Sequence, residues 1–98
     1  TVPYAAAQST MTDEEKEILF LTASTYRNMG RLEGQMEITS IFIDSFNETV
    51  TDSYNLTGTY NGIVDQYNEL ADNLNWIMEG YFGDDVPDDL ILSHKTHI

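Results

Sequence analysis

The feature that most constrains the fold is a regular spacing of apolar residues between positions 59 and 82. Apolar side chains recur there in alternating steps of three and four, the heptad pattern of an α-helix that packs against other helices. A third apolar position in each repeat widens this face. The residues of this heptad seam are Tyr60, Ile63, Val64, Tyr67, Leu70, Ala71, Leu74, Ile77, Met78 and Tyr81. A wide face that is rich in tyrosine favours a helical bundle over a two-stranded coiled coil.

A second long helix is predicted earlier in the chain, from about residue 13 to about residue 50. Thr12 and Glu15 have the spacing of a capping box, which marks the start of a helix. Apolar residues then follow mainly in steps of three and four as far as Phe46. Because glycine is a poor helix former, the pattern leaves open whether this helix is continuous or broken near Gly30.

Between the two helices, residues 51–58 are rich in Thr, Ser, Asn, Asp and Gly, which favour turns. A reversal of the chain there would pair the two helices as an αα-hairpin. We therefore expect one all-α domain over residues 1–98. Its parts would be an extended N-terminal arm (1–11), a helical hairpin (12–82), and an acidic turn with a C-terminal tail (83–98).

The C-terminal tail allows two interpretations. Pro87 suits the first turn of a helix, so a short helical segment could begin there. Otherwise Leu90 to Leu92 would lie as an extended strip on the helices or on a neighbouring chain. His94 and His97 would lie one turn apart in a helix, but without a third ligand they make a poor zinc site. We expect them to be solvated.

The charge of the chain is strongly negative, at −13, and no Lys or Arg occurs from Leu32 through His94. This acidity disfavours nucleic acid and anionic membranes as direct ligands, because both carry the same sign of charge. A saline environment, bound cations or a basic partner protein would each account for it. No apolar run is long enough to span a bilayer.

Residue patterns typical of catalysis or of cofactor binding are missing. The chain has no cysteine, which excludes disulfides and thiolate chemistry. It also lacks the motifs of nucleophilic hydrolases, phosphate-binding loops and zinc peptidases. The acidic cluster Asp84, Asp85, Asp88 and Asp89 does not follow the order of a calcium-binding loop, which favours a solvated loop. We expect no enzyme, no cofactor and no metal site.

Three residues outside the seam are candidates for other contacts. Trp76 lies off the seam, either as a second contact surface or covered by the first helix or by the C-terminal strip. Asn47 and Asn55 each begin an Asn-x-Thr sequon for N-glycosylation. Two sequons are close to what chance gives for this composition, so both asparagines are weak candidates.

Together these patterns favour a non-catalytic structural or assembly subunit that acts through helix–helix packing with protein partners, as a homo- or hetero-oligomer. A virion component (capsid, neck or tail) is the example that this type of composition suggests, and it is our expectation for localisation. One alternative is an acidic inhibitor that mimics nucleic acid and blocks a DNA-binding protein. Another is a secreted or surface helical binding module of a halophile.

The spacing of acids on the predicted second helix bears on the nucleic-acid mimic. Asp65, Asp72 and Glu79 face away from the seam and recur every seventh residue, which is roughly 10.5 Å along a helix. Duplex DNA carries roughly one charge per 1.7 Å. The row is therefore sparse for a mimic of a duplex.

Overall fold

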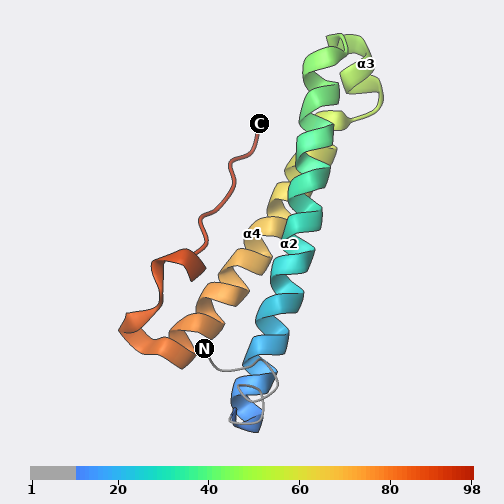
Figure 1. Cartoon of the computed structure of the whole chain (residues 1–98). Helices are drawn as coiled ribbons and strands as arrows, with labels where there is room; N and C mark the ends of the chain where they lie inside the picture. The colour runs from blue at the N-terminus through green and yellow to red at the C-terminus, as the bar shows by residue number, and fades with distance from the viewer. Residues whose placement is uncertain (1–10) are drawn as a thin grey trace.

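The computed structural model describes residues 11–98 and shows a helical hairpin followed by an extended C-terminal segment (Figure 1). Two long helices, α2 (Asp13–Ser45) and α4 (Leu56–Phe82), run antiparallel and pack against each other. A short helix, α3 (Glu48–Ser53), joins them, and two 3-10 turns follow, η1 (Gly83–Asp85) and η2 (Asp88–Leu90). The predicted all-α hairpin is confirmed. The predicted arm at 1–11 lies, except for Met11, outside the described residues.

The start of α2 is fixed by the predicted capping box. The Thr12 hydroxyl accepts a hydrogen bond from the Glu15 backbone N–H at 3.1 Å. In return, Glu15 Oε1 accepts one from the Thr12 N–H at 3.0 Å. The hydrogen bond from the Thr12 backbone holds the pKa of the Glu15 carboxyl below its usual value.

The end of α2 differs from the prediction. The helix passes through Gly30 without a break and ends at Ser45, not near residue 50. The reason is local capping: Asn47 accepts a hydrogen bond from the Val50 N–H at 2.9 Å and thereby starts a new helix. The expected single helix over 13–50 is therefore two helices that meet at Phe46–Asn47.

The predicted turn at 51–58 is shorter than expected. Helix α3 extends to Ser53 and α4 begins at Leu56, so only Tyr54 and Asn55 separate them. Asn55 has a φ of 51°, in the left-handed region that asparagine tolerates better than most residues. A Cβ at position 58 would lie only 2.5 Å from the Asn55 side-chain oxygen, so Gly58 leaves the space that this turn needs.

The core lies between α2 and α4, and α2 supplies Met29, Leu32 and Met36 to it. From α4 it takes six residues of the heptad seam, Ile63, Val64, Tyr67, Ala71, Leu74 and Met78. The remaining seam residues are half-buried, except Tyr81, which is exposed. The seam is thus largely covered within one chain.

The last third of α2 exposes apolar side chains that the sequence pattern grouped with the first helix. The buried positions Met29, Leu32 and Met36 are followed, at the same spacing, by Thr39. The Thr39 hydroxyl donates a hydrogen bond to the Gln35 carbonyl at 2.7 Å. The neighbouring large residues are left outside the core, because they lie on an adjacent face of the helix. This α2 apolar face consists of Ile38, Ile41 and Phe42 of α2 and of Phe46, which is the C-cap of the helix.

Candidate functional site

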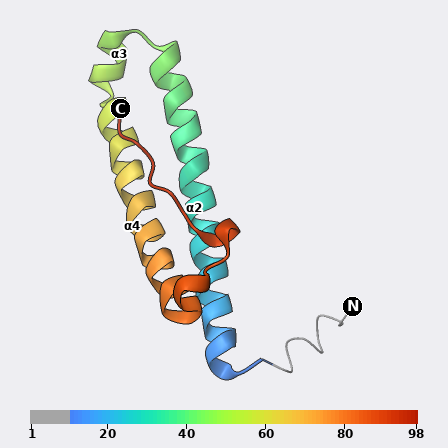
Figure 2. The same cartoon turned by 90° about the vertical axis from the view of Figure 1, so that its left-hand side faces the viewer.

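The C-terminal segment, residues 91–98, runs back along α4 toward the α3 end of the hairpin (Figures 1 and 2). It is extended and contains no helix or strand. Three half-buried asparagines of α4, Asn61, Asn68 and Asn75, hold it. We refer to these three residues as the amide ladder.

Each asparagine of the amide ladder binds both backbone groups of one residue. Asn75 accepts from the Leu92 N–H at 3.1 Å and donates to the Leu92 carbonyl at 2.9 Å. Asn68 makes the same two bonds with Lys95, at 2.7 and 3.0 Å. Asn61 makes them with Ile98, at 2.9 and 3.3 Å. The six bonds involve only backbone atoms of the segment, so they recognise its conformation more than its side chains.

Matching repeats explain why this pairing can continue over three steps. Seven residues of α-helix rise roughly 10.5 Å, and three residues of extended chain span at most roughly 9.9–10.8 Å. Ile91, the first residue of the segment, has φ −76° and ψ 127°, close to polyproline II, in which every third residue faces the same way and three residues rise roughly 9.3 Å. Three residues of chain, in or near this conformation, therefore advance by nearly the same distance as a heptad of α4.

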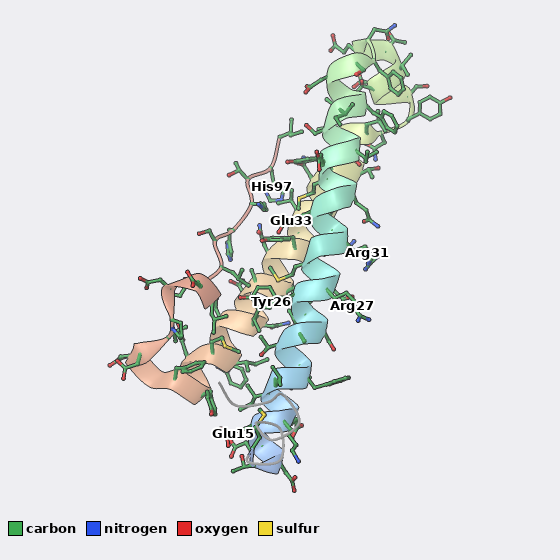
Figure 3. The ribbon with its side chains drawn as sticks, viewed as in Figure 1. Glu15, Tyr26, Arg27, Arg31, Glu33 and His97 are labelled. Carbon is green, nitrogen blue, oxygen red and sulfur yellow. The ribbon has the colours of Figure 1, made fainter. Side chains whose placement is uncertain are left out.

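Two histidines follow the same register. His94 Nε2 lies 2.6 Å from Asp72 Oδ1, and His97 Nε2 lies 2.5 Å from Asp65 Oδ1. Both histidines are exposed, as expected, but extended chain, unlike helix, also places both of them over α4 beside these carboxylates. Both pairs are more than half exposed, so solvent screens them. His97 points toward α4, whereas Arg27 and Arg31 point away on the far side of α2 (Figure 3).

Two tyrosines make further contacts with the segment and with η2. The Lys95 ammonium lies 5.3 Å from the centre of the Tyr67 ring, a cation–π distance. Burial, followed by the negative charge of Glu33, raises the pKa of the Tyr67 hydroxyl. The Tyr26 hydroxyl donates to the Leu90 carbonyl at 3.3 Å, and burial raises its pKa as well. The buried Tyr67 and the partly buried Tyr26 thus contact this part of the chain from the hairpin, while the amide ladder holds its backbone.

The sequence carried a signal for this site that the patterns above did not use. The three asparagines share one heptad position on α4, and Asp65 and Asp72 share another. Those two positions are neighbours on the helix surface. The spacing placed these acids only on the side of the helix away from the seam, and the asparagines were not considered.

The other predicted site residues lie apart from the ladder. Trp76 is 76% exposed, so α2 does not cover it. It borders a shallow depression together with Ile18 and Tyr81. Asn47 is the N-cap of α3 and Asn55 is exposed in the turn, and their glycosylation stays a prediction.

An apolar groove of about 300 Å³ lies at the opposite end of the hairpin from α3. Met11, Ile18, Met78 and Leu90 are among the residues that line it. At this end the Tyr81 hydroxyl donates to Glu15 Oε2 at 3.1 Å. That hydrogen bond is the main cause of the raised pKa of Tyr81.

Metal-binding and membrane-spanning features are not found in residues 11–98. No group of three or more His, Asp or Glu side chains in this range could hold a metal ion. None of the helices in this range is both long enough and apolar enough to cross a bilayer.

Comparison with known proteins gives no family model, no curated protein and no solved structure that matches the chain. The geometry is therefore the guide to function. It presents two surfaces: the α2 apolar face, and an amide-lined helix surface that binds extended backbone.

Proposed function

We propose that this protein is a non-catalytic assembly subunit that associates with other protein subunits through the α2 apolar face. The observation that carries the proposal is the exposure of its four large side chains, between 43 and 53%. Phe42 and Phe46 stack on each other, with ring centres 5.5 Å apart. Residues three and four positions apart are neighbours on a helix surface, so Ile38, Ile41 and Phe42 lie side by side. Contiguous apolar patches on soluble proteins commonly mark interaction sites.

The burial of the heptad seam supports this choice of surface. Because α2 already covers most of the seam, another chain could use it only by opening the hairpin. The α2 apolar face needs no such opening. Tyr54, which is 72% exposed, adds a further aromatic side chain near the same end of the molecule.

A second copy of the chain is the simplest partner for this face. Two equal apolar faces can pair about a two-fold axis, so that each buries the other. Burial at the centre of such an interface offsets the repulsion between two chains of charge −13. Salt would strengthen the association by screening that repulsion.

The nucleic-acid mimic has less support. Asp65 and Asp72, two members of the acidic row on α4, are engaged by His97 and His94. A basic partner would have to displace the C-terminal segment before it could reach them.

The test is sedimentation velocity over a range of protein concentrations. We expect the unmodified chain to form a species larger than a monomer, and Phe42→Ser to shift it toward the monomer. Phe20→Ser is the matched control, since Phe20 is 71% exposed on α2 but lies far from the face. A chain that stays monomeric at all concentrations, or a Phe42→Ser variant that assembles like the control, would contradict the proposal.

A further inference from the structure

We propose that α4 carries a binding track for an extended cationic segment, and that residues 91–98 of a second copy bind this track in exchange for the chain's own segment. The track consists of Asn61, Asp65, Asn68, Asp72 and Asn75. The inference deepens the assembly role proposed above and rests on it, because assembly brings two copies together. It adds how subunits become linked once they are close.

The first argument is that the track binds the backbone of the segment. All six amide bonds go to the N–H and carbonyl groups of Leu92, Lys95 and Ile98. They arise from α4 alone, so an identical segment from another copy can make the same six bonds. Exchange between two copies therefore loses none of them, which is the general reason that swapping of identical elements costs little.

The second argument is charge complementarity. Helix α4 contains Asp65, Glu69, Asp72 and Glu79 and no basic residue. The segment 91–98 contains Lys95 and two histidines and no acid. Because the acids of the chain all lie before residue 91, the side chains of the segment carry only positive charge, and the acidic α4 of a second copy attracts it. The occupant that fits the track by charge is thus supplied by the chain itself.

The third argument is the connection between the segment and the hairpin. Val86 and Pro87 separate the two 3-10 turns in extended backbone, with φ/ψ of −62°/123° and −56°/136°. Within residues 11–98, the Tyr26 hydroxyl makes the one side-chain hydrogen bond from the helices to η2, at the Leu90 carbonyl, and the partly buried Val86, Leu90 and Leu92 pack against the core. Rotation about the Val86–Pro87 connection would redirect the segment while α2 and α4 stay packed.

The experiment exploits the absence of cysteine in the natural sequence. Glu69 and Thr96 are exposed and adjoin the bonded pair Asn68–Lys95, and neither takes part in the two hydrogen bonds of that pair. One copy of the 98-residue chain carries Glu69→Cys and the other carries Thr96→Cys. A short bismaleimide then reports, by the mass of the linked product, whether the segment of the second copy lies on the track of the first.

Two complementary sets of substitutions force the choice between copies. The Glu69→Cys copy also carries Lys95→Pro and Ile98→Pro, which remove two N–H donors from its own segment. The Thr96→Cys copy also carries Asn61→Ala and Asn68→Ala, which disable its own track. An intact segment and an intact track then meet only between chains. We expect roughly tenfold more mixed cross-link than from the two single-cysteine copies alone, since two ordinary hydrogen bonds correspond to about that factor.

The matched control moves the prolines to the Thr96→Cys copy, where they disable the segment that carries the cysteine. The Glu69→Cys copy then keeps both its own track and its own segment, and the excess of mixed cross-link should disappear. A chain with both cysteines should cross-link within itself, which verifies the geometry. If that chain cross-links internally but the complementary copies give no excess of mixed product, the exchange is refuted. If it fails to cross-link at all, the track itself is refuted.

The size measurement keeps this inference separate from the proposed function. A chain that assembles through the α2 apolar face but shows no mixed cross-link retains the assembly role and loses the exchange. A chain that is monomeric by sedimentation and gives no mixed product loses both.

Discussion

The two faces of α4 hold their neighbours by different means. On the inner face, Val64, Ala71 and Leu74 are completely buried against the rest of the hairpin. On the outer face, the half-buried Asn61, Asn68 and Asn75 hold an extended segment through six hydrogen bonds. The inner contact removes apolar area from water, whereas the outer one exchanges bonds with water for bonds with backbone.

This difference sets what each face can specify. Apolar burial is non-directional and roughly proportional to area, so it fixes the strength of the hairpin more than its register. Paired amide bonds depend on distance and angle, and a shift of the segment by one residue would break all of them together. The inner face therefore supplies most of the stability, and the outer face supplies the register.

The largest expected effect is on the inner face. Leu74→Ala removes a side chain with no exposed area and should lower the free energy of unfolding by about 2–5 kcal/mol, through lost burial and the cavity left behind. Chemical denaturation followed by circular dichroism measures this. Trp76→Ala, two residues away and 76% exposed, is the control and should change stability by less than about 0.5 kcal/mol. Equal effects of the two variants would show that the inner face is not the main source of stability.

The next effect concerns the turn that directs the chain from the inner to the outer face. Gly83 ends α4 with φ 64° and ψ −131°, a region open almost only to glycine. Gly83→Ala should therefore cost about 1–3 kcal/mol, measured by the same denaturation. Gly80→Ala, within α4 and with open space around its Cβ, should instead be neutral or stabilising by up to about 1 kcal/mol. If both alanines act alike, the turn is not the constraint that its geometry indicates.

Much of the hairpin could be predicted from the sequence because its signals are local. The capping box of Thr12 and Glu15 marked the start of α2, and the heptad spacing placed α4 within a few residues of its bounds. The break at Asn47 was missed because an asparagine can cap a helix or lie within one. Whether Asn47 caps a helix or lies within one depends on where the chain reverses, and that is set by tertiary packing.

The candidate site could not be predicted in the same way. Each amide bond joins residues between 17 and 37 positions apart, and the segment has no hydrophobic period of its own. The repeat of asparagine at every seventh position was visible, but an exposed asparagine is common on any helix. The asparagine repeat becomes a binding site only when residues 91–98 lie on it in an extended conformation. That conformation in turn depends on the track, so neither could be predicted without the other.

A smaller effect is expected on the outer face. Asn68→Ala removes both bonds to Lys95, and exposed bonds of this kind contribute about 1 kcal/mol together. Because the segment can detach while the hairpin stays folded, the change should appear as faster hydrogen exchange at the Lys95 amide, with little change in global unfolding. Asn73→Ala, at an exposed position of α4, is the matched control and should leave that amide unchanged. A slow, unaltered Lys95 amide in Asn68→Ala would contradict the ladder.

The smallest effect separates the amides from the charges on the outer face. Asp72→Asn removes the charge that faces His94 and preserves the shape of the side chain. Since the pair is exposed, its contribution should be below about 0.5 kcal/mol and should shrink as salt is added. Glu69→Gln is the control, because it also removes one negative charge from α4. It therefore measures how much the loss of a charge relieves the repulsion within a chain of charge −13. The measurement is again hydrogen exchange at the Lys95 amide, compared between the two variants at low and high salt.

If Asp72→Asn speeds this exchange as much as Asn68→Ala does, and salt abolishes the effect, the outer face is an electrostatic contact that any cationic segment could fill. If the exchange of the Lys95 amide differs little between Asp72→Asn and Glu69→Gln, the amide hydrogen bonds contribute more to binding the segment than the charges do. The track would then select mainly for an extended backbone and only secondarily for positive charge.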